Sequence, residues 1–206
     1  MSDFGATTDE PNRLLALADG IFAIAITLLV LDIGVRQGLD PSAFRQALRE
    51  SVDSLLAYAL SFVVISALWR DHRRIFGNVV AVDTVIIRLT LLGLGLVALM
   101  PFPTTLLADY GGQPQAVAIY AGAVAAVDAV HLSLLLYVAR RPKLLRSTQS
   151  APGVRLLAAD FGTTILILLV SIPLAFVTPF GAKWCWLALV PVRLVLGRLR
   201  RRRPVS

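Results

Sequence analysis

Residues 14–33 form a run of twenty mostly apolar residues, which is the length that a helix needs to cross a bilayer. This run nevertheless contains an acid, Asp19, near its start. A lone charge at the centre of a membrane helix costs roughly 2.5 to 3.5 kcal/mol on insertion scales, so a retained acid normally has a partner and a function. The segment therefore predicts a membrane-spanning helix whose aspartate faces protein.

The composition indicates that most of the chain lies in lipid. Apolar residues make up 57% of the 206 positions, charged residues make up 16%, and the mean hydropathy is +0.75. The net charge of +7 does not indicate a nucleic-acid partner, because the basic residues lie between apolar runs and not along one aromatic-rich stripe. The single cysteine, Cys185, excludes an internal disulfide. We therefore expect an all-α membrane protein.

Six apolar segments approach the length of a membrane span, so residues 1–206 are predicted to form a single domain of six transmembrane helices. The predicted spans cover about residues 14–33, 52–75, 79–107, 116–139, 156–177 and 184–199. Between the first two, Asp40 and Pro41 are typical of the N-cap and first residue of a helix, and predict a short surface helix ending near Glu50. The sixth segment contains Pro191 and Arg193, which leaves open whether it spans fully.

The basic residues predict the orientation of the chain. If the N-terminus is cytoplasmic, most of the twenty lysines and arginines flank the cytoplasmic ends of the predicted spans. The positive-inside rule then places both termini in the cytoplasm of a multi-pass protein of the cell (plasma) membrane. The arginine-rich tail, residues 198–203, is expected to contact anionic lipid at the membrane surface.

Enzymatic chemistry and a bound cofactor or metal are not expected. The chain has only two histidines, His72 and His131, and chemistry at membrane depth normally needs a set of histidines, or a nucleophile beside a general base. Asp128 and His131 are three residues apart and share a helix face. This spacing favours a buried hydrogen-bonded pair between helices, with a proton relay as the less favoured alternative.

One narrow arc of the first predicted helix carries an apolar stripe, at about 100° per residue: Leu17, Gly20, Ile24, Leu28 and Leu31. Thr27 lies at the border of this arc, and Asp19 projects well away from it. Such a stripe is typical of contact with lipid or with another helix, and it is less often the lining of a pore. Spacing alone therefore does not assign the stripe a function.

Specific motifs occur at three places along the chain. Arg13 precedes Asp19 by six positions, and DGIFAIAITLLVLDI follows over residues 19–33. WRDHRRIF stands at residues 69–76, and LMPFPT stands at residues 99–104. Together these segments resemble bacterial relatives of the lysosomal potassium channel called transmembrane protein 175. The first helix of that family begins with Arg-x-x-x-Phe-Ser-Asp, and here Leu17 and Ala18 replace the phenylalanine and the serine.

The resemblance implies a homotetramer of six-helix subunits whose first helices line a central pore for K⁺, the permeant ion. By position, Ile24 would form the narrowest hydrophobic constriction, with Leu28 and Leu31 as further apolar rings. Thr27 would supply a hydroxyl layer that gives a modest preference for K⁺ over Na⁺. A ring of aliphatic side chains can close such a pore by dewetting, without any charged gate.

The resemblance also implies a structural polar network of Arg13, Asp19 and His72 that positions the pore helix against the second helix. Arg13 and Asp19 lie about 9 Å apart along an ideal helix, so His72 is expected to bridge them. Asp32 would lie near the outer mouth. It is expected either to concentrate cations there or to be an ordinary exposed acid at a helix end.

Two other functions remain open from the sequence. A proton- or cation-coupled transporter would use a relay of ionisable residues inside the predicted spans: Arg88, Asp128, His131 and Asp160. A structural membrane subunit would carry no ions at all. The subunit number is also open, because a closed ring of about three to five first helices buries the same stripe.

Overall fold

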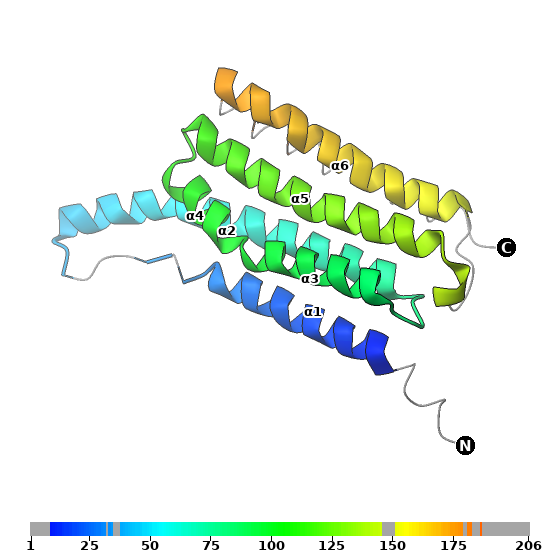
Figure 1. The fold of residues 1–206 in the computed structure, drawn as a ribbon. Helices are drawn as coiled ribbons and strands as arrows, with labels where there is room; N and C mark the ends of the chain where they lie inside the picture. The colour runs from blue at the N-terminus through cyan, green and yellow to red at the C-terminus, as the bar shows by residue number, and fades with distance from the viewer. Residues whose placement is uncertain are drawn as a thin grey trace.

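The protein is described by a computed structural model, which covers residues 9–31, 33–34, 38–145, 151–178, 181–182 and 186. Its α-helices and one 3-10 turn are α1 (Asp9–Leu28), α2 (Pro41–Phe76), α3 (Thr84–Ala98), α4 (Pro101–Asp109), α5 (Pro114–Ala139), η1 (Pro142–Leu144) and α6 (Ala151–Val177). The long helices run along a common direction as a bundle (Figure 1). The predicted all-α fold is confirmed.

The described residues contain five stretches that are long and apolar enough to cross a membrane: Glu10–Leu28, Pro41–Phe76, Thr84–Asp109, Pro114–Ala139 and Gly153–Val177. They correspond in order to the first five predicted spans, so the chain is a multi-pass membrane protein. The sixth predicted span, residues 184–199, lies outside the described residues except for Trp186.

Helix α1 begins and ends about five residues earlier than the predicted span of residues 14–33. Pro11 is tolerated in its first turn, where a backbone N–H has no partner within the helix. After Leu28 the chain leaves the helix in a tight turn, in which the N–H of Leu31 donates to the carbonyl of Leu28 over 3.1 Å. Leu31 therefore lies just beyond the helix end, and Asp32 lies outside the described residues.

The predicted boundary between a surface helix and the second span is wrong, because α2 is one continuous helix of 36 residues. No glycine or proline interrupts it after Pro41, and the Ser51 hydroxyl donates to the Ala47 carbonyl within the helix. At 1.5 Å per residue α2 is about 54 Å long, well beyond the roughly 30 Å of a hydrocarbon core. Its first turns accordingly extend past the neighbouring helices (Figure 1).

The predicted N-cap at Asp40 is confirmed. The carboxylate of Asp40 accepts hydrogen bonds from the backbone N–H groups of Ser42 and Ala43 at 2.8 and 2.9 Å. The Ser42 hydroxyl donates to the same oxygen at 2.6 Å. These bonds, led by the Ser42 hydroxyl, hold the pKa of Asp40 below its ordinary value. The cap therefore favours the ionised acid at the start of α2.

The third predicted span, residues 79–107, is shorter at its start and is divided into α3 and α4. Residues 79–83 are not helical, because Asp83 caps α3 and Val79 forms an isolated antiparallel bridge with Leu145. Pro101 lacks an N–H and begins α4 after a turn at residues 99–100. The prolines of this segment thus mark a helix boundary inside one membrane span.

Helix α5 is the centre of the bundle, since it contacts α2, α3, α4 and α6. The approach of α3 is close at Gly93, where an added Cβ would lie 3.2 Å from Cγ1 of Val130. Helix α1, in contrast, makes its main contacts with two of the described helices, α2 and α3. Among the described helices, α1 is therefore held from one side.

Asp83 ties the start of α3 to the end of α5. One carboxylate oxygen accepts the N–H groups of Val85 and Ile86, at 3.1 and 3.0 Å. The other accepts the Tyr137 hydroxyl at 2.7 Å and lies 3.4 Å from a guanidinium nitrogen of Arg141. Partial burial raises the pKa of Asp83, but the hydrogen bonds and Arg141 outweigh it, so the pKa lies below its ordinary value.

We predict that Asp83→Ala destabilises the protein more than Asp40→Ala does. Both changes remove an N-cap, but among the described contacts Asp83 also bonds a side chain of another helix and Asp40 does not. The loss at Asp83 is expected to be about 1 to 2 kcal/mol, measured as a lower melting temperature of the detergent-solubilised protein.

The pH dependence of the Asp83 contribution has a defined sign. Because the folded-state pKa lies below the ordinary 3.8, this contribution is present above pH 3.8 and is lost as the pH falls through the folded-state pKa. The stability difference between the wild type and Asp83→Asn should therefore shrink in acid. Equal melting temperatures for Asp83→Ala and Asp40→Ala at neutral pH would contradict a tertiary role for Asp83.

Candidate pore helix and its polar brace

Helix α1 has one buried face and one exposed face. The buried face packs into the main hydrophobic core through Ala18, Phe22, Ala25 and Leu29. On the opposite face the side chains of Ile24, Leu28 and Leu31 are 58%, 40% and 74% exposed. The described residues thus leave the apolar stripe identified in the sequence uncovered, including Leu17 near the start of the helix.

Thr27 lies on this exposed side of α1. Its hydroxyl donates to the backbone carbonyl of Ile24 over 2.9 Å. Because the hydroxyl hydrogen is used in that bond, the oxygen presents lone pairs to its surroundings. This is the polarity that a cation or a water donor requires.

Asp19 is held by two side chains of α2. Its carboxylate accepts the indole N–H of Trp69 at 2.7 Å and a guanidinium N–H of Arg73 at 2.9 Å. The Arg73 guanidinium also lies over the Trp69 ring, 5.4 Å from its centroid. These three residues form what we call the polar brace. It gives the acid in α1 both a counter-charge and a neutral donor, as expected for a charge in a membrane helix.

The carboxylate of Asp19 is hydrogen-bonded to Trp69 and Arg73, and His72 does not bridge Asp19 to Arg13 among the described contacts. Six residues along a helix turn a side chain by about 120°, so Arg13 projects away from Asp19 and is exposed. His72 is buried instead, with its ring centroid 5.9 Å from Phe22 and 5.5 Å from His131. Its Nε2 forms no hydrogen bond within the described part of the chain.

One signal in the sequence indicates the observed brace. Trp69 and Arg73 are four residues apart, and a helix places such residues on one face. His72, three residues after Trp69, packs instead between Phe22 of α1 and His131 of α5.

The chain is similar to known potassium channels over most of its length. Residues 13–101 match the family described as the endosomal/lysosomal potassium channel TMEM175. A protein of Streptomyces collinus named a potassium channel is 35% identical over 82% of this chain and 84% of its own length. A Chamaesiphon minutus protein, also named a potassium channel, is 35% identical over 82% of this chain and 86% of its own length.

The chain belongs to the TMEM175 family. A crystal structure of a lysosomal potassium-selective channel TMEM175 homolog from Chamaesiphon minutus has a similar fold, with a TM-score of 0.78 at 31% identity. The similarity covers 91% of this chain and 98% of that one. The predicted membership is therefore confirmed over most of the chain, including α1 and the brace residues of α2.

This TMEM175 chain also buries ionisable residues away from the stripe. Asp71, Asp128, His131 and Asp160 are almost fully buried, and Asp71 forms an ion pair with Arg74 at 2.8 Å. Asp128 and His131 both face the interior of the bundle, whereas Arg88 is exposed on α3. The residues expected for a transport relay therefore do not all gather at one place, and among the described residues no group of His, Cys, Asp and Glu is arranged to hold a metal.

We predict that Arg73→Gln lowers the stability of the folded, assembled protein, whereas Arg70→Gln does not. Both arginines are exposed on the last turns of α2, but within the described residues only Arg73 pairs with Asp19. Loss of the pair should cost about 1 kcal/mol, seen as a lower melting temperature and a smaller assembled fraction in gel filtration. Asp19→Asn should act in the same direction and leave ion selectivity unchanged. Equal behaviour of Arg73→Gln and Arg70→Gln would show that the brace does not hold α1.

Proposed function

We propose that this protein is a potassium-selective cation channel whose pore is lined by α1. The observation that carries the proposal is the exposed apolar stripe on α1, which is fixed outward by the polar brace. Support comes from the relatives that are named potassium channels and share about a third of this sequence over most of its length.

The pore would require several copies of α1 around one axis, and we infer a homotetramer of six-helix subunits in the cell membrane. Among the described helices α1 makes its main contacts with α2 and α3, and its exposed face would be available to neighbouring subunits. The distribution of basic residues supports cytoplasmic termini. With this orientation, the start of α1 marks the inner end of the pore.

Ile24 would form the narrowest constriction, with Leu28 and Leu31 as further apolar rings toward the outer end. Aliphatic side chains that meet on an axis leave an opening from which water withdraws readily. The ring would therefore close the pore by dewetting, and conduction would need the helices to rotate or separate. The constriction carries no charge, so the proposed gate opposes every ion through the cost of dehydration.

Thr27 would supply the layer that favours K⁺. Its oxygen, with its hydrogen donated to the Ile24 carbonyl, can replace part of the water that a cation loses next to the apolar ring. Dehydration costs less for K⁺ than for Na⁺, so a single weak hydroxyl layer gives only modest selectivity. Asp32 would add cation attraction at the outer mouth.

The polar brace would set the angle of α1 in the assembled channel. Asp19 would be its central residue, with Trp69 and Arg73 as its direct partners in each subunit. His72 would support the same region through its contact with Phe22 of α1. Arg13, which is exposed, would not be part of the polar brace of its own subunit.

We predict that Ile24→Asn increases single-channel conductance and the open fraction, because an amide keeps water in the constriction. Purified protein in planar bilayers gives the measurement. Leu166→Asn is the matched control, since Leu166 is 62% exposed but lies on α6, away from the proposed pore. If Ile24→Asn protein assembles and its currents equal those of the wild type, the constriction lies elsewhere.

We predict that Thr27→Ala lowers the permeability of K⁺ relative to Na⁺ several-fold at most, while Thr27→Ser preserves it. Alanine removes the oxygen, and serine keeps it at the same position. The reversal potential under opposed K⁺ and Na⁺ solutions reports the ratio. Identical reversal potentials for wild type and Thr27→Ala would remove Thr27 from the selectivity layer.

A coupled transporter is the second candidate, favoured by the buried Asp128, His131 and Asp160. A transporter would show saturating flux that depends on a second gradient, whereas a channel shows ohmic current steps in a planar bilayer. Absence of any flux would instead indicate a structural subunit.

A further inference from the structure

The exposed arc of α1 continues inward beyond Leu17 to the first turns of the helix. Counted at about 100° per residue, Glu10 and Arg13 project within roughly 40° of the direction of Ile24. Both side chains are exposed, and neither forms an ion pair with a described side chain. The proposed pore-lining face thus ends in one acid and one base.

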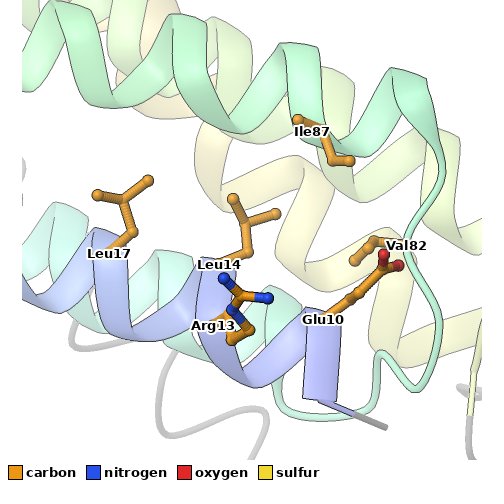
Figure 2. Close-up of a pocket in the computed structure, with 6 residues that line it drawn as sticks. All are labelled: Glu10, Arg13, Leu14, Leu17, Val82 and Ile87. Carbon is orange, nitrogen blue, oxygen red and sulfur yellow. The ribbon is translucent and has the colours of Figure 1, made fainter. Parts of the chain in front are cut away.

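Glu10 and Arg13 also line an open groove beside this arc. The groove encloses about 380 Å³ and lies between α1 and the start of α3, with walls of Leu14, Leu17, Val82 and Ile87. Figure 2 shows the two charged side chains near the start of α1 and the apolar side chains along the walls. Among the described residues, both charges are therefore open to water at the end of the bundle where α1 begins.

We propose that Glu10 and Arg13 form two charged rings at the inner mouth of the pore. These rings would determine how fast cations enter and would favour monovalent over divalent cations. This inference rests on the proposed pore formed by α1. Three residues separate the rings by about 4.5 Å along the axis, with Glu10 outermost and Arg13 nearer to the constriction. An entering ion would meet the acids first and the bases second.

The order of the rings determines their effects. Repeated around an axis, Glu10 concentrates K⁺ at the entrance over a distance of about one Debye length, roughly 8 to 10 Å. Arg13 then opposes every cation in proportion to its charge, so Mg²⁺ meets about twice the repulsion that K⁺ meets. The mouth would thus gather monovalent cations efficiently, while divalent cations remain at the acid ring.

The test measures single-channel currents of the full-length protein in planar bilayers, with ions entering from the inner side. In about 20 mM KCl, Glu10→Gln should lower the inner-to-outer current about two- to three-fold, and the change should vanish in about 1 M KCl. Arg13→Gln should raise the same current and let Mg²⁺ permeate measurably. Glu10→Asp should keep the wild-type current, because it retains the charge.

Asp53→Asn is the matched control for Glu10→Gln. Asp53 is an exposed acid in the first half of α2, and the start of α2 lies at the opposite end of the bundle from the start of α1, so its loss should leave the inner-to-outer current unchanged (Figure 1). The conductance of the wild type gives a test that needs no variant. It should fall less than proportionally as KCl is lowered, because the acid ring maintains the local K⁺ concentration.

The outcomes separate this inference from the proposed pore. If Ile24→Asn alters conductance but Glu10→Gln and Arg13→Gln leave low-salt currents unchanged, the pore stands and the charged mouth is wrong. A conductance strictly proportional to KCl in the wild type overturns the charged mouth as well. If currents occur and Ile24→Asn does not affect them, the proposed pore itself fails.

Discussion

The hydrogen-bonded ion pair at Asp19 determines which way α1 faces. A carboxylate inside a membrane helix is tolerated only where donors and a counter-charge meet it, and here both come from one face of α2. Asp19 and Ile24 project about 140° apart around α1, so turning the acid toward α2 turns the aliphatic stripe away from the subunit. The exposed stripe is therefore a consequence of where the charge finds its partners.

The helices of the subunit differ in how extensively they are packed, as α5 and α1 illustrate. Helix α5 is surrounded by four other helices and contributes many of the fully buried side chains. Among the described helices α1 packs mainly on α2 and α3, and its buried face includes the small residues Ala18 and Ala25. Small side chains at an interface allow the backbones of two helices to approach closely. An element that must move to open a pore is expected to be held in this way, with a directional polar contact to define its resting angle.

Local signals predicted those features of the fold that depend on a few neighbouring residues. The Asp40 cap, the opposite faces of α1 and the burial of Asp128 with His131 all follow from helical spacing and hydrogen-bonding chemistry. The continuity of α2 was missed because polar residues near Ser51 resemble the end of a span, although a helix longer than the bilayer needs no break there. The start of α3 was missed because the aliphatic residues 79–82 are typical of a span, whereas their pairing with the segment after α5 depends on tertiary contact.

The partners of Asp19 also depend on tertiary contacts that the sequence alone does not predict. The resemblance to the family implied a network of Asp19 with Arg13 and His72. A sequence motif does not specify which side chain hydrogen-bonds which atom. Within the described residues, Trp69 and Arg73 reach the carboxylate of Asp19, whereas the ring of His72 packs between Phe22 of α1 and His131 of α5. The position of Arg13 on the exposed arc is set by helical geometry alone, since it depends only on its six-residue separation from Asp19.

The proposed gate and the charged mouth oppose ions through different physical effects at different depths of α1. Glu10 and Ile24 are about 21 Å apart along the helix axis, which exceeds the Debye length of about 8 Å at physiological ionic strength. The Coulomb field of the mouth is therefore largely screened in the water between them and does not reach the constriction. Dehydration at an aliphatic ring does not depend on such screening, so salt should change how often ions arrive at the gate and not how high the barrier is once they are there.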